Sequence, residues 1–172
     1  GTGSLVLDHQ NKIAYAALSP RTDLEVLDDW CARTQFKRVA FNAFGGDGTA
    51  VYHTNVLMTM ADDYVIIALD SIKDIDQRTQ LLKLFKKTKK EVIDISIEQM
   101  NAFAGNMLQL VNDQDQKCLV MSSSAYKSLS QEQIDVISNK HRNRIIYVPI
   151  NVIETIGGGS ARCMIAEVFG VN

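Results

Sequence analysis

Cys163 is the residue best suited to covalent chemistry. It follows three consecutive glycines at 157–159, it stands at the start of an expected strand, and Arg162 lies beside it. Positive charge and free loop amides near a thiol favour its use as a nucleophile. Most free cysteines are instead small, buried, apolar residues. Cys31, on an expected helix face, and Cys118, inside an expected strand, fit that second description.

His53 is the matching general acid or base. An imidazole titrates near neutral pH, and a cysteine paired with a histidine is a known nucleophilic arrangement. Asn55 lies two residues further on, and the alternation of side chains along a strand would place it on the same face as His53. The sequence therefore predicts a thiol–imidazole site with an amide beside it.

Metal and cofactor chemistry are not expected. The three histidines and three cysteines form no closely spaced pair of ligands, so no metal site is predicted. The loop at 157–160 lacks the lysine of a phosphate-binding loop and does not open a helical pattern. We therefore expect neither a nucleotide nor another cofactor.

An internal repeat supplies the elements that must position these residues. Similar apolar runs begin at positions 5, 56 and 107, at intervals of 51 residues, and a polar turn and a second strand-like run follow each. A helix and a further apolar run complete each unit. The pattern predicts three strand–strand–helix–strand units around one core, followed by a final strand at about 163–169 that begins a fourth.

Each expected helix begins with a capping signal. Capping boxes start at Thr22 and Ser130, and a close variant starts at Asp74. Apolar residues at helical spacing are then expected to face the core. These residues are Leu24, Leu27, Cys31, Ile75, Leu82, Phe85, Ile134 and Ile137.

The repeat also predicts where the chemistry lies. Equivalent positions of a repeat array gather around a common axis, so the residues just before each first strand should converge. They are 1–4, 53–55, 104–106 and 159–163. The group contains small residues, His53, Cys163 and two asparagines, which is typical of a site more than of a core.

Composition excludes several classes of protein. The 172 residues are 46% hydrophobic, and 18 basic against 20 acidic residues give a net charge of −2. This balance disfavours nucleic-acid binding, which needs a basic surplus. The longest unbroken apolar run, at 64–69, is too short to cross a bilayer, and no signal peptide is visible. With three scattered cysteines and no disulfide pattern, we expect a cytoplasmic protein without a membrane or nucleic-acid partner.

Four segments together resemble a known family. They are 1–8, 52–58, 100–106 and 154–163, and they span nearly the whole chain. They resemble the pentein superfamily of guanidine-modifying enzymes, which includes arginine deiminase, dimethylarginine dimethylaminohydrolase and the amidinotransferases. The nearest likeness is to bacterial amidinotransferase-like proteins known as citrulline-utilization hydrolases. Arg21 falls in a segment, 19–22, that resembles the family's Ser-x-Arg-Thr motif.

The resemblance implies an α/β fold, a β/α propeller of five ββαβ modules within a single domain. About three modules would be present, at about 1–50, 51–102 and 103–152, with the final strand in 153–172. It also implies that the chain is the C-terminal part of a longer enzyme. A carboxylate would then stand directly before Gly1, where relatives use it to orient the histidine or to hold substrate.

The resemblance also implies roles for individual residues. Cys163 would attack the guanidinium or ureido carbon, and His53 would protonate the leaving amine and then activate water. Arg21 would bind the substrate α-carboxylate, which suits a guanidinium fork. Asn55 and Asn106 would contact substrate, and Asn55 carries a neutral amide where several relatives have a carboxylate.

The leading hypothesis is hydrolysis of a C–N bond in an arginine-like or citrulline-like small molecule, as in hydrolases of linear amidines such as the deiminases. Two alternatives stay open. One is transfer of the amidino group to an amine acceptor, and the other is a non-catalytic, ligand-binding propeller. Assembly into a homo-oligomer is also left open.

Overall fold

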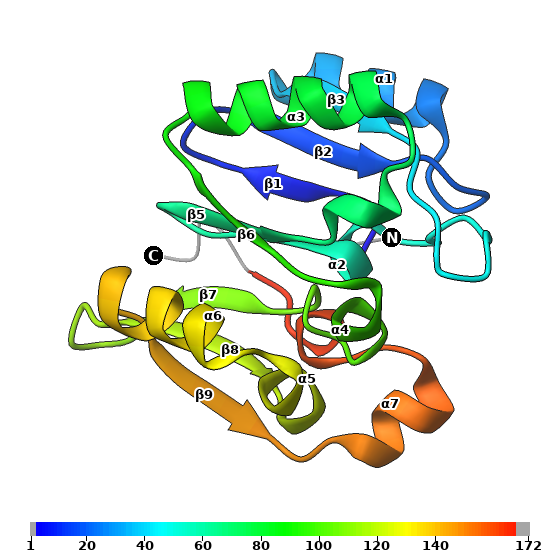
Figure 1. The fold of residues 1–172 in the computed structure, drawn as a ribbon. Helices are drawn as coiled ribbons and strands as arrows, with labels where there is room; N and C mark the ends of the chain where they lie inside the picture. Colours follow the sequence, from blue (N-terminus) through cyan, green and yellow to red (C-terminus); the bar gives the residue numbers. More distant parts are fainter. Residues whose placement is uncertain (1–2, 168–172) are drawn as a thin grey trace.

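Three small mixed sheets follow one another along the chain. The structure is a computed structural model that describes residues 3–167 (Figure 1). In each sheet the first two strands are antiparallel and the second and third are parallel. This arrangement confirms the three strand–strand–helix–strand units that the repeat predicts.

The elements have the following bounds. The first unit contains β1 (Val6–Asp8), β2 (Ile13–Ala17), α1 (Leu24–Thr34) and β3 (Lys37–Phe41). The second contains α2 (Thr54–Leu57), β4 (Met58–Met60), β5 (Tyr64–Ile67), η1 (Leu69–Ser71), α3 (Ile75–Lys87) and β6 (Glu91–Asp94). The third contains α4 (Ile97–Asn101), β7 (Leu108–Val111), β8 (Lys117–Ser122), α5 (Ser123–Ser128), α6 (Gln131–Asp135), the π-helical η2 (Val136–Lys140) and β9 (Arg144–Val148). The short helix α7 (Asn151–Gly157) and the 3₁₀ turn η3 (Ala161–Met164) follow.

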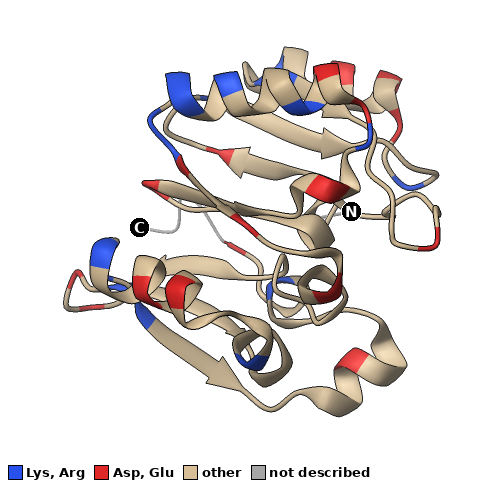
Figure 2. Cartoon of the chain, viewed as in Figure 1, with Lys and Arg blue, Asp and Glu red and all other residues tan. Residues whose placement is uncertain are grey.

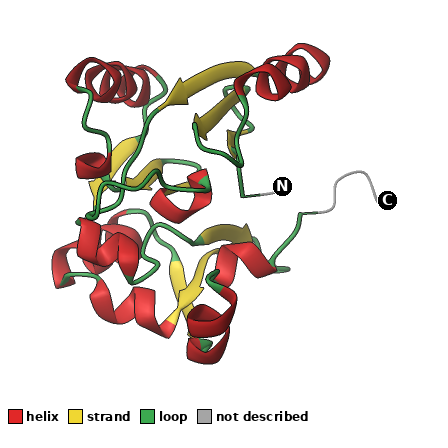
Figure 3. Ribbon diagram, turned by 90° about the vertical axis from the view of Figure 1, so that its right-hand side faces the viewer, coloured by secondary structure: helices red, strands yellow, loops and turns green. Residues whose placement is uncertain are grey.

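The first sheet lies between two helices, as Figure 3 shows. Successive side chains of a strand point to opposite faces. Ala14 and Ala16 of β2 therefore pack with Leu27 of α1, in a small buried cluster. Tyr15 faces the other way, into the main core, where its ring lies 5.5 Å from that of Phe85 of α3. The helix of the second unit thus helps to join the first two units.

The first strands of the three units lie side by side. β1 contacts β4, and β4 contacts β7. The buried Thr59 of β4 donates a hydrogen bond to the carbonyl of Gly105 (2.8 Å) and accepts one from the amide of Met107 (3.0 Å). The first strands therefore line a common axis, as the repeat predicts.

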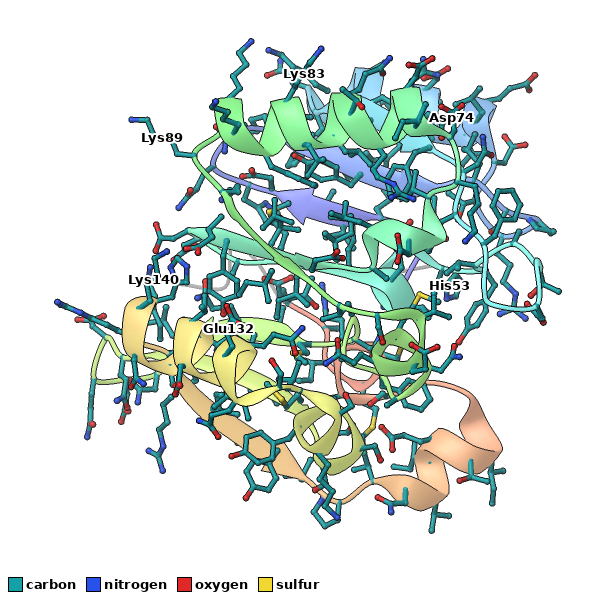
Figure 4. All side chains as sticks on the ribbon, viewed as in Figure 1. His53, Asp74, Lys83, Lys89, Glu132 and Lys140 are labelled. Carbon is teal, nitrogen blue, oxygen red and sulfur yellow. The ribbon has the colours of Figure 1, made fainter. Side chains whose placement is uncertain are left out.

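A buried ion pair joins the first two units at the end of the strands that lies away from His53. Lys90 and Asp8 are both buried and lie 3.6 Å apart, and the Lys90 ammonium also donates to the carbonyls of Ala61 and Asp62. Figure 4 labels Lys89 and Lys140 on this side and His53 on the opposite side. Figure 2 shows charged residues mainly on helices and turns, while the strands are mostly uncharged.

Two of the three helix starts are as predicted. Ser130 forms a complete capping box with Gln133, and Asp74 caps α3. The first helix begins one residue later than expected, with Asp23 as its cap in place of Thr22. The reason is that the Thr22 amide is bonded to the Ser19 carbonyl in a tight turn, which leaves the next residue to start the helix.

The predicted apolar faces are correct only in part. Leu27, Cys31, Phe85 and Ile137 are buried, but Leu24, Ile75 and Leu82 are 40%, 67% and 38% exposed. Each helix contacts the core through a narrow stripe. In α3 that stripe runs through Leu81 and Phe85, four residues apart, so Leu82 falls on its flank.

The predicted final strand is not present in the described residues. Cys163 and Met164 belong to η3, residues 165–167 have no regular structure, and 168–169 lie outside the described residues. The short helix α7, which precedes η3, was not expected from the sequence. No helix within residues 3–167 combines the length and the apolar character needed to cross a membrane.

The close approach of α2 and the segment before β7 generates a stability prediction. A Cβ at the buried Gly105 would overlap the Val56 carbonyl oxygen and lie 2.7 Å from the Leu57 carbonyl carbon. Gly105→Ala should therefore lower the free energy of unfolding by about 1–3 kcal/mol, the usual cost of overpacking. Urea denaturation measures this change.

The matched control is Gly157→Ala, at the exposed end of α7, where the nearest atom to an added Cβ is 3.8 Å away. Its effect should stay within about 0.5 kcal/mol. Equal effects of the two substitutions would contradict the packing described for Gly105.

Candidate active site

A chain of hydrogen bonds brings four distant segments together. The Asn55 amide donates to the Gly3 carbonyl (3.1 Å). The Asn106 side-chain amide donates to the Asn55 carbonyl (2.8 Å), and its oxygen accepts from the Arg162 amide (3.1 Å). The residues before β1, β4 and β7 therefore meet the glycine loop near η3, which is red in Figure 1.

Cys163 lies in the turn η3. The prediction that it starts a strand is therefore wrong. Its amide donates to the Ser160 carbonyl (3.1 Å), which closes the turn. Its exposed sulfur accepts from Asn106 Nδ2 at 3.3 Å and from Asn55 Nδ2 at 3.7 Å. Cys31 and Cys118 are buried, as their positions predicted.

His53 occupies the N-cap position of the one-turn helix α2, where its side chain makes no capping hydrogen bond, and it does not lie in a strand. The strand-face argument that paired it with Asn55 was therefore wrong, because the turn at 53–56 is closed by a bond from the Val56 amide to the His53 carbonyl. Its ring stands against Gly3: a Cβ there would lie 2.6 Å from Nδ1. Burial, and the positive charge of Arg21, lower the pKa of His53 below its ordinary value of 6.5.

Asn55 follows His53 by two residues, and its side chain contacts the Cys163 thiol. Its side chain is almost fully buried, at 3% exposed. The amide nitrogen contacts Cys163, but Oδ1 has no hydrogen-bond partner among the described residues. A buried acceptor without a partner is costly, and a ligand N–H donor would satisfy it.

Arg21 lies on an exposed turn that is tied to the segment containing His53. The Ser19 hydroxyl accepts from the Arg21 amide (3.1 Å) and donates to the Tyr52 carbonyl (2.8 Å). The guanidinium carbon lies 5.7 Å from the centre of the Tyr52 ring. Its charge therefore acts at the same end of the molecule as the imidazole.

Tyr52 is a site residue that the sequence analysis missed. Its hydroxyl donates to the Gly158 carbonyl (2.6 Å), and its ring lies 5.0 Å from that of His53. Burial, and the negative charge that Cys163 carries when ionised, raise the pKa of the Tyr52 phenol, whereas Arg21 opposes the shift. Tyr52 thus stays a donor at neutral pH and links the imidazole segment to the glycine loop. Its place directly before His53 was the only available signal.

Asn106 lies behind the thiol. It is 1% exposed, and both of its N–H donors are directed at groups of the protein, the Asn55 carbonyl and the Cys163 sulfur. These contacts hold Cys163 in place, and the contact with substrate that the resemblance implies for Asn106 stays a prediction.

A cavity of about 590 Å³ lies beside these residues. Its lining includes Arg21, Asn55 and Arg162, together with apolar side chains of the first strands such as Met58 and Leu108. A volume of this order holds a small molecule. His53 and Cys163 are not among its lining residues; the cavity reaches their neighbour Asn55. Within residues 3–167 no group of three His, Cys, Asp or Glu side chains is placed to hold a metal ion.

Comparison with protein families gives one match. The family described as N,N dimethylarginine dimethylhydrolase, eukaryotic, matches residues 1–170. A search of curated proteins finds no match to the chain.

Solved structures share the fold at low sequence identity. ArgZ in its apo form, an arginine dihydrolase from cyanobacteria, matches with a TM-score of 0.72 and 14% identity, over 99% of this chain and 25% of that one. The product-bound N-terminal domain of ArgZ gives 0.72 and 15%, over 95% and 54%. Agmatine deiminase of C. jejuni gives 0.53 and 13%, over 94% and 53%. The chain thus spans between a quarter and about half of the length of these structures.

The electrostatics of the site lead to a titration experiment. Because Arg21 contributes to the lowered pKa of His53, Arg21→Gln should raise that pKa towards 6.5. NMR titration of the His53 ring protons measures the change. Arg144→Gln, a charge loss on the exposed strand β9, is the control and should leave the His53 titration where it is in the unmodified protein. A His53 pKa at or above 6.5 in the unmodified protein would contradict the described burial.

Proposed function

The chain belongs to the N,N dimethylarginine dimethylhydrolase family, within the pentein superfamily of guanidine-modifying enzymes, and on that premise we propose that it contributes the cysteine and histidine of a guanidino-group hydrolase. The substrate is a small molecule with a guanidino or ureido group. The bond cleaved joins the central carbon to an amine nitrogen.

One observation carries the proposal. The exposed sulfur of Cys163 is held by the side-chain amides of two asparagines, and one of these, Asn55, follows His53 by two residues at the N-terminal end of α2. A thiol with an imidazole in the same small region is the arrangement that nucleophilic cysteine chemistry requires. Cys31 and Cys118 are buried, which leaves them less accessible to a substrate than Cys163.

The first half of the reaction forms a covalent adduct. The lowered pKa of His53 keeps its imidazole neutral at pH 7, so it accepts the thiol proton. The sulfur of Cys163 then attacks the planar carbon, and the resulting tetrahedral intermediate collapses when the imidazolium returns the proton to the leaving amine. The amine departs and a thiouronium-type adduct remains on Cys163.

The second half releases the product. His53 now accepts a proton from water, and the oxygen attacks the adduct carbon. The bond from carbon to sulfur breaks, the sulfur leaves as thiolate, and the imidazolium proton returns to it. The net change adds one water, forms a ureido product from a guanidino substrate and regenerates both residues.

Asn55 and Arg21 are suited to hold the substrate. The unpartnered Oδ1 of Asn55 accepts one N–H of the guanidino group beside the sulfur. Arg21, exposed on the cavity wall, pairs with a carboxylate at the other end of the substrate, because a guanidinium matches a carboxylate in a bidentate geometry. An arginine-like molecule carries both groups.

The structural neighbours are consistent with this chemistry. The N-terminal domain of ArgZ has been solved covalently bound to a reaction intermediate, and a cysteine-to-serine mutant of it with substrate. At 15% identity these structures establish the shared fold alone. The chemistry for this chain therefore depends on its own residues.

The nucleophile is tested by substitution in the intact protein. Cys163→Ser should lower kcat at least ~1000-fold, because the hydroxyl is a far weaker nucleophile, with little change in substrate binding. Release of ammonia or amine from arginine-like and citrulline-like compounds measures kcat. Cys118→Ala is the control and should keep turnover. Undiminished turnover by Cys163→Ser would exclude this mechanism, and a new amidino compound formed only with an added amine would indicate transfer in place of hydrolysis.

The carboxylate contact is tested by comparing two substrates. Arg21→Gln should lower kcat/KM for a guanidino amino acid by about 10- to 100-fold, the value of a hydrogen bond to a charged group. The same guanidine without its carboxylate should be affected far less. The ratio of kcat/KM for the two substrates separates this contact from the effect of Arg21 on His53, which both substrates share. If the substitution leaves that ratio unchanged, Arg21 acts only through its effect on the His53 imidazole.

A further inference from the structure

Helix α7 presents an unusual pattern of burial just before the catalytic turn. Its apolar residues face solvent: Val152 is 71%, Ile153 42% and Ile156 82% exposed. The one buried residue of its seven is Glu154, which is 8% exposed. This is the only acidic residue of α7. The described structure therefore anchors α7 through a carboxylate and not through apolar packing.

Both oxygens of that carboxylate have short hydrogen bonds. Oε1 accepts from the Ser160 hydroxyl at 2.7 Å, and Oε2 accepts from the Ser124 hydroxyl at 2.7 Å. No cation is bonded to Glu154 in the part of the chain that the structure describes. Burying a carboxylate is costly, and hydrogen bonds to a charged acceptor of this length offset part of that cost.

The two serines belong to different parts of the molecule. Ser160 is fully buried, and its carbonyl accepts the amide of Cys163, which closes the catalytic turn. Ser124 lies in the first turn of α5, directly after β8, beside the buried Ala125. The Glu154 carboxylate thus fastens the turn that carries the thiol to the core of the third unit.

We propose that Glu154 is a positioning residue for Cys163. The bond to Ser160 fixes the start of the turn, while Asn106 fixes its other end through the Arg162 amide and the sulfur. Both ends are needed because glycines 157–159 give the preceding segment little stiffness of its own. Without the carboxylate, the sulfur moves away from the amides of Asn55 and Asn106.

The effect on turnover rests on the function proposed above, but the position of the thiol can be measured separately. Iodoacetamide alkylates exposed thiols, and Cys163 is the exposed one of the three cysteines, so mass spectrometry of its peptide reports its reactivity alone. The experiment compares this alkylation rate at fixed pH with kcat and KM, in the intact protein.

The variants separate positioning from stability. Glu154→Ala should lower kcat at least ~10-fold and slow alkylation about fivefold with KM little changed, since a displacement of about 1 Å at a reacting atom costs up to about 100-fold. Glu154→Gln keeps an acceptor and a donor for the two hydroxyls and should restore most of both rates. Ser124→Ala should give values of kcat and of the alkylation rate between those of Glu154→Ala and Glu154→Gln. Ser128→Ala is the matched control, because Ser128 lies in the same helix and its hydroxyl donates to the Ala125 carbonyl.

The outcomes decide the proposal. It is overturned if Ser124→Ala and Glu154→Ala match Ser128→Ala in alkylation and kcat, or if turnover falls while alkylation does not change. Loss of melting temperature without either kinetic effect would show a structural role only and would also overturn it. If Glu154→Ala does not fold, Ser124→Ala and Glu154→Gln give the answer. If the unmodified protein turns over no guanidino compound, the proposed function fails, and the alkylation rates still test the position of Cys163.

Discussion

The structure depends on hydrogen bonds that pass from one repeat to the next at the common axis. The Thr54 hydroxyl donates to the Ser4 carbonyl and accepts the Ala17 amide, and Asn106 in turn donates to the Asn55 carbonyl. Ser4, Asn55 and Asn106 are spaced by 51 residues, so each repeat contributes the same position to this network. The thiol at its end is therefore held by residues from several units, and its surroundings exist only once those units have packed together.

Close packing at the axis explains where small residues are needed. Gly105 lies against the backbone at 56–57, and Gly3 lies against the ring of His53. Gly159 touches Cys163, where an added Cβ would be 3.3 Å from the sulfur. In each case the absence of a side chain lets another segment approach closely, and two of the three approaches shape the candidate site directly.

The buried ion pair of Lys90 with Asp8 and the buried side chain of Asn55 differ in their hydrogen bonding. At the end away from His53, Lys90 pairs with Asp8 and also donates to two carbonyls, so the buried charges are satisfied within the protein. At the other end Asn55 Oδ1 has no partner among the described residues, and it lies beside the thiol and the cavity. Satisfied buried groups stabilise the fold, whereas an unsatisfied acceptor next to a nucleophile is typical of a place where a ligand completes the bonding.

Local pattern in the sequence determined the repeat, the three sheets, two of the helix caps and the convergence of the segments that contain His53, Asn55, Asn106 and Cys163. These features follow from the 51-residue interval and from alternating or helical spacing, which neighbouring residues define. The roles of Tyr52, Asn106 and Glu154 emerged only in the tertiary structure, as did the turn at 53–56 and helix α7. Their hydrogen bonds join residues up to 106 positions apart, from Tyr52 to Gly158. Which donor meets which acceptor at that separation is decided by how the units pack, and no periodicity along the chain specifies it.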